Sequence, residues 1–147
     1  MRIAVGNDHA GLALKRALLP HLEELGLQTI NLGVDSEAPA DYPDMAEAVA
    51  RAVVGGEAEL GLLICGTGLG VCMAANKIVG ARAATCCFEY HAVMARRHNH
   101  ANICCLGARV TGEELAKAIV TAFVRTPEDT AERHVRRRRK IEALEER

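Results

Sequence analysis

Short apolar runs alternate with stretches of helical periodicity along the whole chain, and this alternation is the strongest constraint on its fold. The apolar runs occupy residues 3–6, 28–32, 60–64, 81–85 and 102–106. Apolar side chains recur at helical spacing over residues 11–25, 44–54, 69–77, 89–98 and 112–124. Strands that are separated by helices connect through right-handed crossovers and lie parallel in one sheet. The sequence therefore predicts an α/β fold built on five parallel strands.

The run Leu60–Ile64 is almost continuously apolar, which is typical of a strand covered by helices on both faces of the sheet. That arrangement is the doubly wound, Rossmann-like fold, in which ligands bind at the carboxyl ends of the strands. Polar residues gather at such ends: Asp8 and His9 follow the first run, and residues 65–70 follow the third. We expect the functional site at this edge of the sheet.

The sequence is expected to form one domain over residues 1–147, in the cytoplasm. Its 50% hydrophobic content is enough for a buried core. Residues 1–6 have the pattern of a strand rather than of a signal peptide, and no apolar stretch is long enough to span a bilayer. Six cysteines in such a chain are expected to be free thiols. A net charge of -1 predicts no general attraction to nucleic acid or to an anionic membrane.

The segment Gly66–Gly70 has the pattern G-x-G-x-G between a buried strand and a helix. Backbone N–H groups in such a loop can converge on an anion, with support from the helix dipole. A dinucleotide site would instead carry G-x-G-x-x-G after the first strand, and a nucleoside-triphosphate loop would end in Lys followed by Ser or Thr. A tight turn without a ligand is the alternative interpretation, because short glycine patterns often occur by chance.

Cys65 directly precedes this glycine loop, where N–H groups at a helix N-terminus would stabilise a thiolate. A thiolate at that point is a usable base. The remaining cysteines are expected to fill the core, one inside a helix and the others at strand ends: Cys72, Cys86, Cys87, Cys104 and Cys105. Neighbouring residues of a strand point to opposite faces, so the adjacent pairs are not expected to chelate one metal ion.

Two histidine-containing segments have both a structural and a functional interpretation. Asp8 precedes a helix, so it can act as an N-cap, as a site residue or as both. His98 and Asn99 fall near the end of an arginine-containing helix. A histidine there can simply complement the negative end of the helix dipole, and without other evidence this interpretation is preferred to a catalytic one.

The charged tail, residues 127–147, carries a thin apolar stripe at helical spacing, formed by Val135, Ile141 and Leu144. We expect a helix that packs on a partner subunit in a homodimer or a larger assembly. Arg133 and Arg137 lie one turn apart on one face, where such a pair can bind a phosphate. A solvated charged face is the alternative, and the 3% aromatic content argues against a nucleic-acid surface.

Six segments taken together resemble the ribose-5-phosphate isomerase B family, and they span nearly the whole chain: residues 7–11, 41–43, 64–70, 74–77, 97–99 and 133–134. The family also includes galactose-6-phosphate isomerase subunits and members active on allose 6-phosphate. Some members use a glutamate just after the glycine loop as their base. Val71 occupies that position here, so this sequence is similar to the cysteine-type branch.

The resemblance implies that Cys65 is the proton acceptor, that Thr67 assists it and that His98 is the acid that opens the sugar ring. It also implies a substrate-binding set, in which side chains hold the sugar, loop amides hold the enediolate and arginines hold the phosphate: Asp8, His9, Tyr42 and Asn99; Gly66, Gly68, Leu69 and Gly70; Arg109, Arg133 and Arg137. Arg136 and Arg138 leave the choice of the last arginine open. No metal or cofactor is implied, and the site is expected to form between two subunits.

The expected activity is the interconversion of D-ribose 5-phosphate and D-ribulose 5-phosphate through a cis-enediolate. The alternative within the family is isomerisation of a hexose 6-phosphate, either allose or galactose. Two alternatives come from other classes: a sugar-phosphate sensor without catalysis, and a nucleotide-binding module. The presence of both Cys65 and His98 argues against the sensor, and the glycine spacing argues against the nucleotide-binding module.

Overall fold

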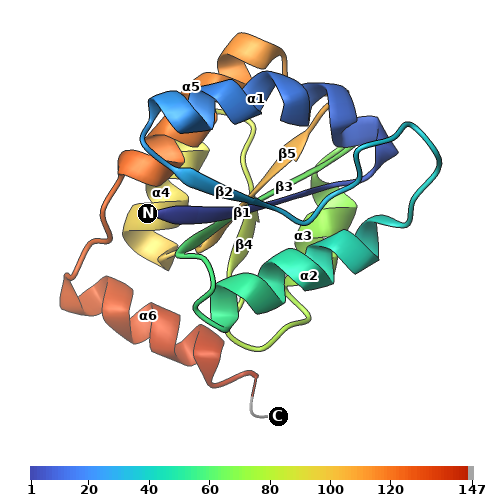
Figure 1. Cartoon of the computed structure of the whole chain (residues 1–147). Helices are drawn as coiled ribbons and strands as arrows, with labels where there is room; N and C mark the ends of the chain where they lie inside the picture. Colours follow the sequence, from blue (N-terminus) through green and yellow to red (C-terminus); the bar gives the residue numbers. More distant parts are fainter. Residues whose placement is uncertain (146–147) are drawn as a thin grey trace.

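The computed structural model describes residues 1–145 and contains a five-stranded parallel sheet in the order β2-β1-β3-β5-β4 (Figure 1). The strands are β1 (Arg2–Asn7), β2 (Gln28–Asn31), β3 (Leu60–Cys65), β4 (Ala83–Thr85) and β5 (Ile103–Gly107). All four pairings are parallel. The α/β, doubly wound prediction is confirmed, with strand ends shifted by one or two residues.

Helices cover both faces of this sheet (Figure 1). One face carries α1 (Leu12–Glu24), α4 (Glu89–Asn99) and α5 (Glu113–Arg125), and the other carries α2 (Tyr42–Val54) and α3 (Leu69–Ala75). Their buried residues recur at three- and four-residue spacing, as in Leu14, Leu18 and Leu22 of α1. A short 3-10 turn, η1 (His9–Gly11), precedes α1, and α6 (Glu132–Glu142) follows α5.

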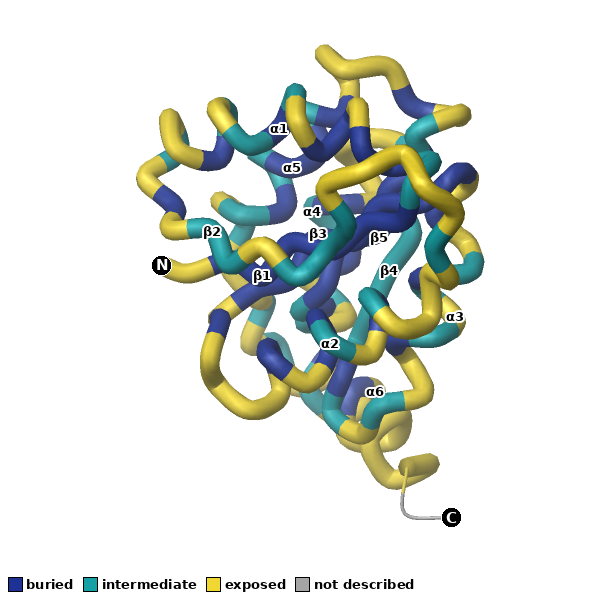
Figure 2. The backbone as a smooth tube through the Cα atoms, turned by 45° about the vertical axis from the view of Figure 1, so that its right-hand side comes forward, coloured by how far each residue is buried: buried dark blue, intermediate teal, exposed yellow. Residues whose placement is uncertain are grey.

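The core lies in two layers, with β3 buried at all six of its positions. Figure 2 shows β3 and β5 in the buried interior, whereas the segment between β2 and α2 is largely exposed. Burying a leucine or valine side chain contributes about 1.5–3 kcal/mol, so this two-layer core holds the strand ends in fixed positions. Cys104 and Cys105 lie inside β5, not at a strand end as the sequence predicted, because the strand continues to Gly107.

Helix α6 packs beside α4 of its own chain (Figure 1). Arg82 forms an ion pair with Glu142 at 3.6 Å, and the Gly80 N–H donates to Glu145 Oε1 at 3.1 Å. Of the predicted apolar stripe, Ile141 is 46% exposed and Leu144 is 59% exposed. Packing of this stripe on a partner subunit stays a prediction. None of the helices within residues 1–145 is long and apolar enough to cross a membrane.

Candidate active site

The candidate active site lies where β1 and β3 are neighbours at the centre of the sheet. From β1 the chain continues to β2 on one side, and from β3 it continues to β4 and β5 on the other. The connections therefore diverge above the carboxyl ends of β1 and β3, which is the usual ligand-binding crevice of this fold. The Asp8 N–H donates to the Ile64 carbonyl at 3.2 Å, so the first residues of both loops are held side by side.

The glycine loop folds back over the thiol of Cys65. The Gly68 N–H donates to Cys65 Sγ at 3.2 Å, and the cysteine is 4% exposed. Gly68 has a φ of 77°, and a Cβ at this position would lie 2.9 Å from the Leu106 carbonyl carbon. Only glycine therefore fits, and its N–H stabilises negative charge on the sulfur.

Hydrogen bonds from β4 and from the end of β5 hold the rest of this loop. The Thr85 hydroxyl donates to the Gly68 carbonyl at 2.8 Å, and the Arg109 N–H donates to the Gly66 carbonyl at 3.0 Å. Thr67 Oγ1 accepts the Leu69 N–H at 3.3 Å. This bond leaves the hydroxyl hydrogen of Thr67 free for a ligand, on a residue that is exposed.

Asp8 and His9 line the β1 side of the crevice. Asp8 Oδ1 accepts the Gly11 N–H at 3.1 Å, so the predicted N-cap is confirmed. The cap uses one oxygen of a carboxylate that has two. His9 Nδ1 accepts the Ala40 N–H at 3.1 Å, so the imidazole carries its hydrogen on Nε2 in the neutral form. His9 can therefore donate a hydrogen bond to a bound oxygen.

Tyr42 and Arg109 lie against the glycine loop from two sides. A Cβ on Gly70 would lie 2.6 Å from Tyr42 Cζ, and a Cβ on Gly66 would lie 2.9 Å from Arg109 Nη1. The missing side chains of these glycines therefore make room for a phenol and a guanidinium. The structure brings together one group of predicted site residues at this edge: Asp8, His9, Tyr42, Cys65, Gly66, Thr67, Gly68, Leu69, Gly70 and Arg109.

The other predicted site residues form a second cluster between α4 and α6. The rings of His98 and His134 stack with centroids 4.0 Å apart and planes 8° apart. Asp129 Oδ2 lies 3.8 Å from His134 Nε2 and 3.7 Å from Arg97 Nη2. Burial, and then the neighbouring charges of His98 and Arg133, lower the pKa of His134, so this ring favours its neutral form.

The two clusters lie at opposite ends of the parallel strands, one near their amino ends and the other near their carboxyl ends. Helix α4 ends at Asn99, just before β5 begins at Ile103, whereas Cys65 pairs with Gly107 at the far end of β5. Four strand residues span about 13 Å at about 3.3 Å each. Figure 1 likewise draws α6 on the side where β1 begins and α3 on the side where it ends. One chain therefore does not bring its own His98, Asn99, Arg133 and Arg137 to its Cys65.

The arginines of α6 differ in what they are free to bind. Arg138 is buried, donates to the Asp129 carbonyl at 3.0 Å and pairs with Glu128 at 3.1 Å. It therefore stabilises the turn before α6. Arg133, Arg136 and Arg137 are exposed. Arg138 is accordingly a poor candidate for a phosphate, and Arg133 and Arg137 keep the one-turn spacing that suits one.

Potential metal-ligating atoms gather at His98, Asp129 and His134, all within 4.8 Å of one another. The two imidazole rings are nearly parallel and stacked, however. The lone pair of each ring nitrogen lies in the plane of its own ring, so two stacked rings do not direct their lone pairs at one ion. We assign this cluster no metal.

Lys15, which the sequence-based predictions do not include, is a buried lysine that supports the site. It is 1% exposed, and its Nζ donates to Asn31 Oδ1 at 3.2 Å, to the Val34 carbonyl at 2.7 Å and to Asp35 Oδ1 at 2.7 Å. Hydrogen bonds from Lys15 and then Asn31 lower the pKa of Asp35. Lys15 thereby anchors the start of the segment that leads to Ala40 and so to His9.

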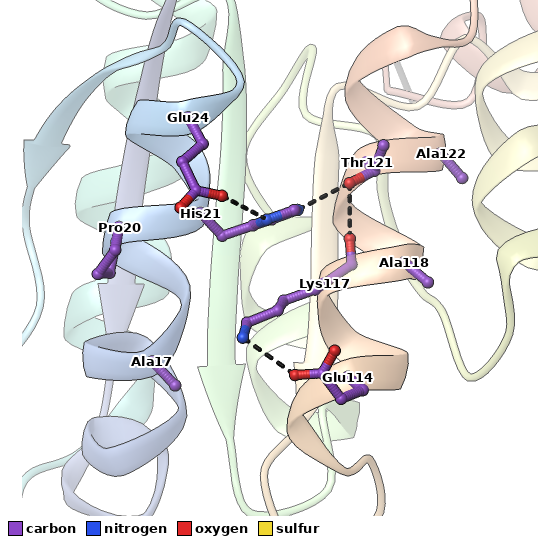
Figure 3. A pocket seen from close by; sticks show the side chains of 9 residues that line it. All are labelled: Ala17, Pro20, His21, Glu24, Glu114, Lys117, Ala118, Thr121 and Ala122. Carbon is purple, nitrogen blue, oxygen red and sulfur yellow. Dashed lines mark hydrogen bonds and ion pairs between the residues drawn. The ribbon is translucent and has the colours of Figure 1, made fainter.

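A groove of about 680 Å³ lies between α1 and α5, away from both clusters (Figure 3). His21 Nε2 and Thr121 Oγ1 are 2.8 Å apart across it, and Lys117 pairs with Glu114 at 3.1 Å. Its polar groups are already bonded to one another, as Figure 3 shows. None of the predicted site residues lines this groove.

Comparison with known proteins identifies sugar-phosphate isomerases as relatives of this chain. A family model described as Ribose/Galactose Isomerase matches residues 3–141. Ribose-5-phosphate isomerase B of Escherichia coli is 45% identical, over 99% of this chain and 97% of that protein. D-erythrulose-4-phosphate isomerase of Pectobacterium atrosepticum is 43% identical, over 84% and 82% of the two chains. The structure of ribose-5-phosphate isomerase B from Mycoplasma genitalium with bound ribulose-5-phosphate superimposes with a TM-score of 0.92, at 40% identity over 99% and 96%.

Proposed function

This chain belongs to the ribose/galactose isomerase family, and we propose that it interconverts D-ribose 5-phosphate and D-ribulose 5-phosphate. The observation that carries the proposal is the thiol of Cys65, which accepts the Gly68 N–H at the crevice between β1 and β3. A relative of the same fold is described with ribulose-5-phosphate bound, and another relative is a ribose-5-phosphate isomerase B. Membership of an isomerase family favours an enzyme over a sugar-phosphate sensor.

Cys65 acts as the base that moves one proton between two carbons. After the ring opens, the thiolate removes the proton from C2, and the electron pair shifts to the C1 carbonyl oxygen to form a cis-enediolate. The thiol returns the proton to C1, and the hydroxyl proton of O2 is transferred to O1, so that C2 becomes the ketone and O1 the hydroxyl. The loop amides from Gly66 to Gly70 donate to the developing oxyanion, for which the Gly68 and Leu69 N–H groups exchange their hydrogen bonds to Cys65 Sγ and Thr67 Oγ1. The Thr67 hydroxyl assists.

Sugar hydroxyls and the phosphate are held by groups around the loop. Asp8, Tyr42 and the Nε2–H of His9 bind sugar oxygens, and His9 also lies close to the phosphate. The Arg109 guanidinium, which lies beside Gly66, supplies positive charge for the phosphate. Because the phosphate is remote from the reacting carbons, its binding energy orients C1 and C2 against Cys65.

A second copy of the chain completes the site in a homodimer or a dimer of dimers. His98 opens the furanose ring, Asn99 binds the ring oxygen, and Arg133 and Arg137 hold the phosphate, all from the partner. This assignment is supported by the separation of the two clusters, since each chain carries both halves but keeps them at opposite edges of its sheet. The partner's α6 also supplies a use for the exposed arginines.

The protein is proposed to act in the cytoplasm, on a small sugar phosphate and without a nucleic-acid partner, a metal or a cofactor. All six cysteines are free thiols, which fits a reducing compartment. The chemistry requires a base, an acid and oxyanion donors, and Cys65, His98 and the loop amides provide them without a bound group.

Comparison of kcat/KM on four substrates tests this function: ribose 5-phosphate, allose 6-phosphate, galactose 6-phosphate and D-erythrulose 4-phosphate. We expect the pentose to be the best substrate by at least about tenfold, because relatives include a ribose-5-phosphate isomerase B and a structure with bound ribulose-5-phosphate, and a site with fixed reacting and phosphate groups discriminates chain length. Preference for a hexose 6-phosphate or for the four-carbon sugar would reassign the substrate. Binding of the sugar phosphate without turnover on any of them would reinstate the sensor.

A further inference from the structure

The peptide unit between Gly68 and Leu69 is where the glycine loop passes into α3. Gly68 has a φ of 77° and a ψ of -2°. A ψ near zero places the nitrogen of Leu69 on the same side of the chain as the nitrogen of Gly68, so the two N–H groups point into one concavity. They donate to Cys65 Sγ at 3.2 Å and to Thr67 Oγ1 at 3.3 Å. The orientation of this short stretch of backbone therefore sets two of the donors on which the proposed oxyanion depends.

The carbonyl of the same peptide points to the other side of the chain. In a planar trans peptide the C=O and N–H bonds are antiparallel, so the direction of the Gly68 carbonyl fixes the direction of the Leu69 N–H. Gly68 is the N-cap residue of α3, and its carbonyl serves the first hydrogen bond of that helix. The Thr85 hydroxyl donates to the same oxygen, which has two lone pairs, at 2.8 Å. Thr85 therefore holds the peptide from behind the two N–H groups.

Thr85 is itself fixed on the sheet. It is the partner of Cys105 in the pairing of β4 with β5, and the next N–H of β4, that of Cys86, donates to the Cys105 carbonyl at 3.0 Å. The β-branched side chain of Thr85 has few rotamers, so its hydroxyl keeps one direction. Gly68 also packs on β5, since a Cβ on it would lie 2.9 Å from the Leu106 carbonyl carbon. Both ends of the hydrogen bond between Thr85 and Gly68 thus rest on the same strand.

The two ends of the glycine loop are held in different ways. At its start, the Arg109 N–H donates to the Gly66 carbonyl at 3.0 Å, which is a backbone bond that a change of side chain does not remove. At its end, the bond to the Gly68 carbonyl comes from a side chain, that of Thr85. This hydroxyl is therefore the part of the support that a single substitution can remove while the start of the loop keeps its bond.

We propose that Thr85 is a positioning residue for the isomerase reaction, whose hydroxyl keeps the N–H groups of Gly68 and Leu69 aimed at the enediolate oxygen. Thr85 acts through the peptide and needs no contact with the substrate. The part of the inference that concerns the enediolate rests on the proposed function, whereas the hold of Thr85 on the peptide stands without it. A hydrogen bond to the carbonyl also polarises the peptide, which makes its N–H a better donor.

The need for such a hold arises during the reaction. Each of the two N–H groups exchanges a bond to the loop, at Cys65 Sγ or Thr67 Oγ1, for a bond to the oxyanion. A peptide that can tilt at that moment aligns its N–H less well, whereas donors that are already aligned cost no reorganisation when the charge develops. The negative charge is present in the enediolate and not in the bound sugar, so a loss of alignment should lower kcat and leave KM almost unchanged.

Steady-state kinetics of the intact protein on ribose 5-phosphate test the effect on the reaction. Thr85→Val keeps the shape of the side chain and removes the hydroxyl, and Thr85→Ala removes it without placing a methyl group against the carbonyl. Both should lower kcat about three- to tenfold, with KM within about twofold of the wild type. Thr85→Ser restores the hydroxyl and should recover kcat to within about twofold. Thr29→Val is the matched control, because Thr29 lies on β2, the edge strand at the other side of the sheet.

Hydrogen exchange of the Gly68 and Leu69 amides, followed by NMR, tests the hold on the peptide without any substrate. Both amides should exchange about three- to tenfold faster in Thr85→Val than in the wild type. In Thr85→Ser and Thr29→Val they should exchange at the wild-type rate. Unchanged exchange in Thr85→Val would overturn the proposal, because the hydroxyl would then not hold the peptide.

The kinetic results decide the rest. A wild-type kcat in Thr85→Val and Thr85→Ala would overturn the positioning role, and so would a kcat in Thr85→Ser as low as in Thr85→Val, since the hydroxyl would not be the cause. A wild type that turns over none of the sugar phosphates would refute the proposed function, and with it the part of the inference that concerns the enediolate. Faster amide exchange in Thr85→Val would still establish Thr85 as the support of this peptide.

Discussion

The glycine loop and the cluster between α4 and α6 are held together by different interactions, although the proposed reaction uses groups from both. The loop is held by backbone hydrogen bonds and by glycines whose Cβ atoms would collide with β5 and its neighbours. The α4–α6 cluster is held by side chains, through stacked histidines and the ion pairs of Asp129 and Arg138. A rigid backbone suits the proton transfer, and longer side chains suit the capture of a mobile phosphate.

The distance between the glycine loop and the α4–α6 cluster also bears on how the protein would assemble. The glycine loop has its proposed base and oxyanion donors within one chain, and hydrogen bonds from that same chain hold its shape. The α4–α6 cluster presents His98, the proposed acid, and the arginines near the amino ends of the strands, whereas the glycine loop of the same chain lies at their carboxyl ends. In the proposed mechanism this division makes association of two chains a condition for activity, so that assembly and chemistry are linked.

The largest expected loss of kcat comes from removing the proton-transfer group of either region. Cys65→Ala and His98→Asn should each lower kcat by about 10³-fold or more, because each removes a proton-transfer group. Refolding the two variants together should recover about a quarter of wild-type activity. Half of randomly formed dimers pair the two variants, and one of the two sites in each such dimer is intact.

Each variant refolded alone provides the control for this mixing experiment, together with a check that both are dimers by size-exclusion chromatography. Recovery in the mixture but not in the separate samples would establish that Cys65 and His98 come from different chains. No recovery from dimers shown to exchange would place both groups in one chain, and the proposed sharing of the site would be wrong.

Arg133→Ala should raise KM about 10- to 100-fold with a smaller change in kcat, since a guanidinium bound to the phosphate contributes about 1.5–3 kcal/mol. Arg136→Ala is the matched control, because Arg136 is also exposed on α6 but leaves the one-turn pair with Arg137 intact. Steady-state kinetics on ribose 5-phosphate measure both variants. Equal KM values for the two would show that α6 contributes only general positive charge.

Lys15→Met should raise KM about three- to tenfold with little change in kcat, because it frees the segment that holds His9 but leaves Cys65 in place. Methionine keeps most of the buried volume without the ammonium. Arg16→Met is the matched control, since Arg16 is exposed and only reaches the Asp35 carbonyl at 3.3 Å. A fall in kcat as large as the rise in KM would connect this lysine with the glycine loop instead.

Periodicity along the sequence was enough to predict the fold, because strands and helices alternate with clear apolar spacing. The sequence correctly places Cys65 at the end of a buried strand directly before the glycine loop, and its role as the base stays a prediction. The pairing of His98 with His134 could not be predicted, since it depends on how α6 turns back onto α4. The burial of Lys15 was predictable from the sequence, because this lysine lies between Leu12 and Leu18 on an apolar helix face. A lysine at such a position must bury its charge against a partner.

A fall in pH should destabilise the α4–α6 region more than the glycine loop, because the buried His134 resists protonation. An unfolded histidine titrates near 6.5, whereas burial and the neighbouring cations lower the pKa of His134 in the folded chain. As the pH falls below about 6.5, the unfolded state takes up a proton that the folded state resists, so stability is lost on the acid side. Asp129, whose pKa is lowered mainly by the Ala131 N–H, stays ionised through this range and does not contribute to this loss of stability.

The Tm of the wild type should therefore fall more between about pH 7.5 and about pH 5.5 than that of His134→Gln. Equal slopes would mean that α6 is held by its ion pairs alone.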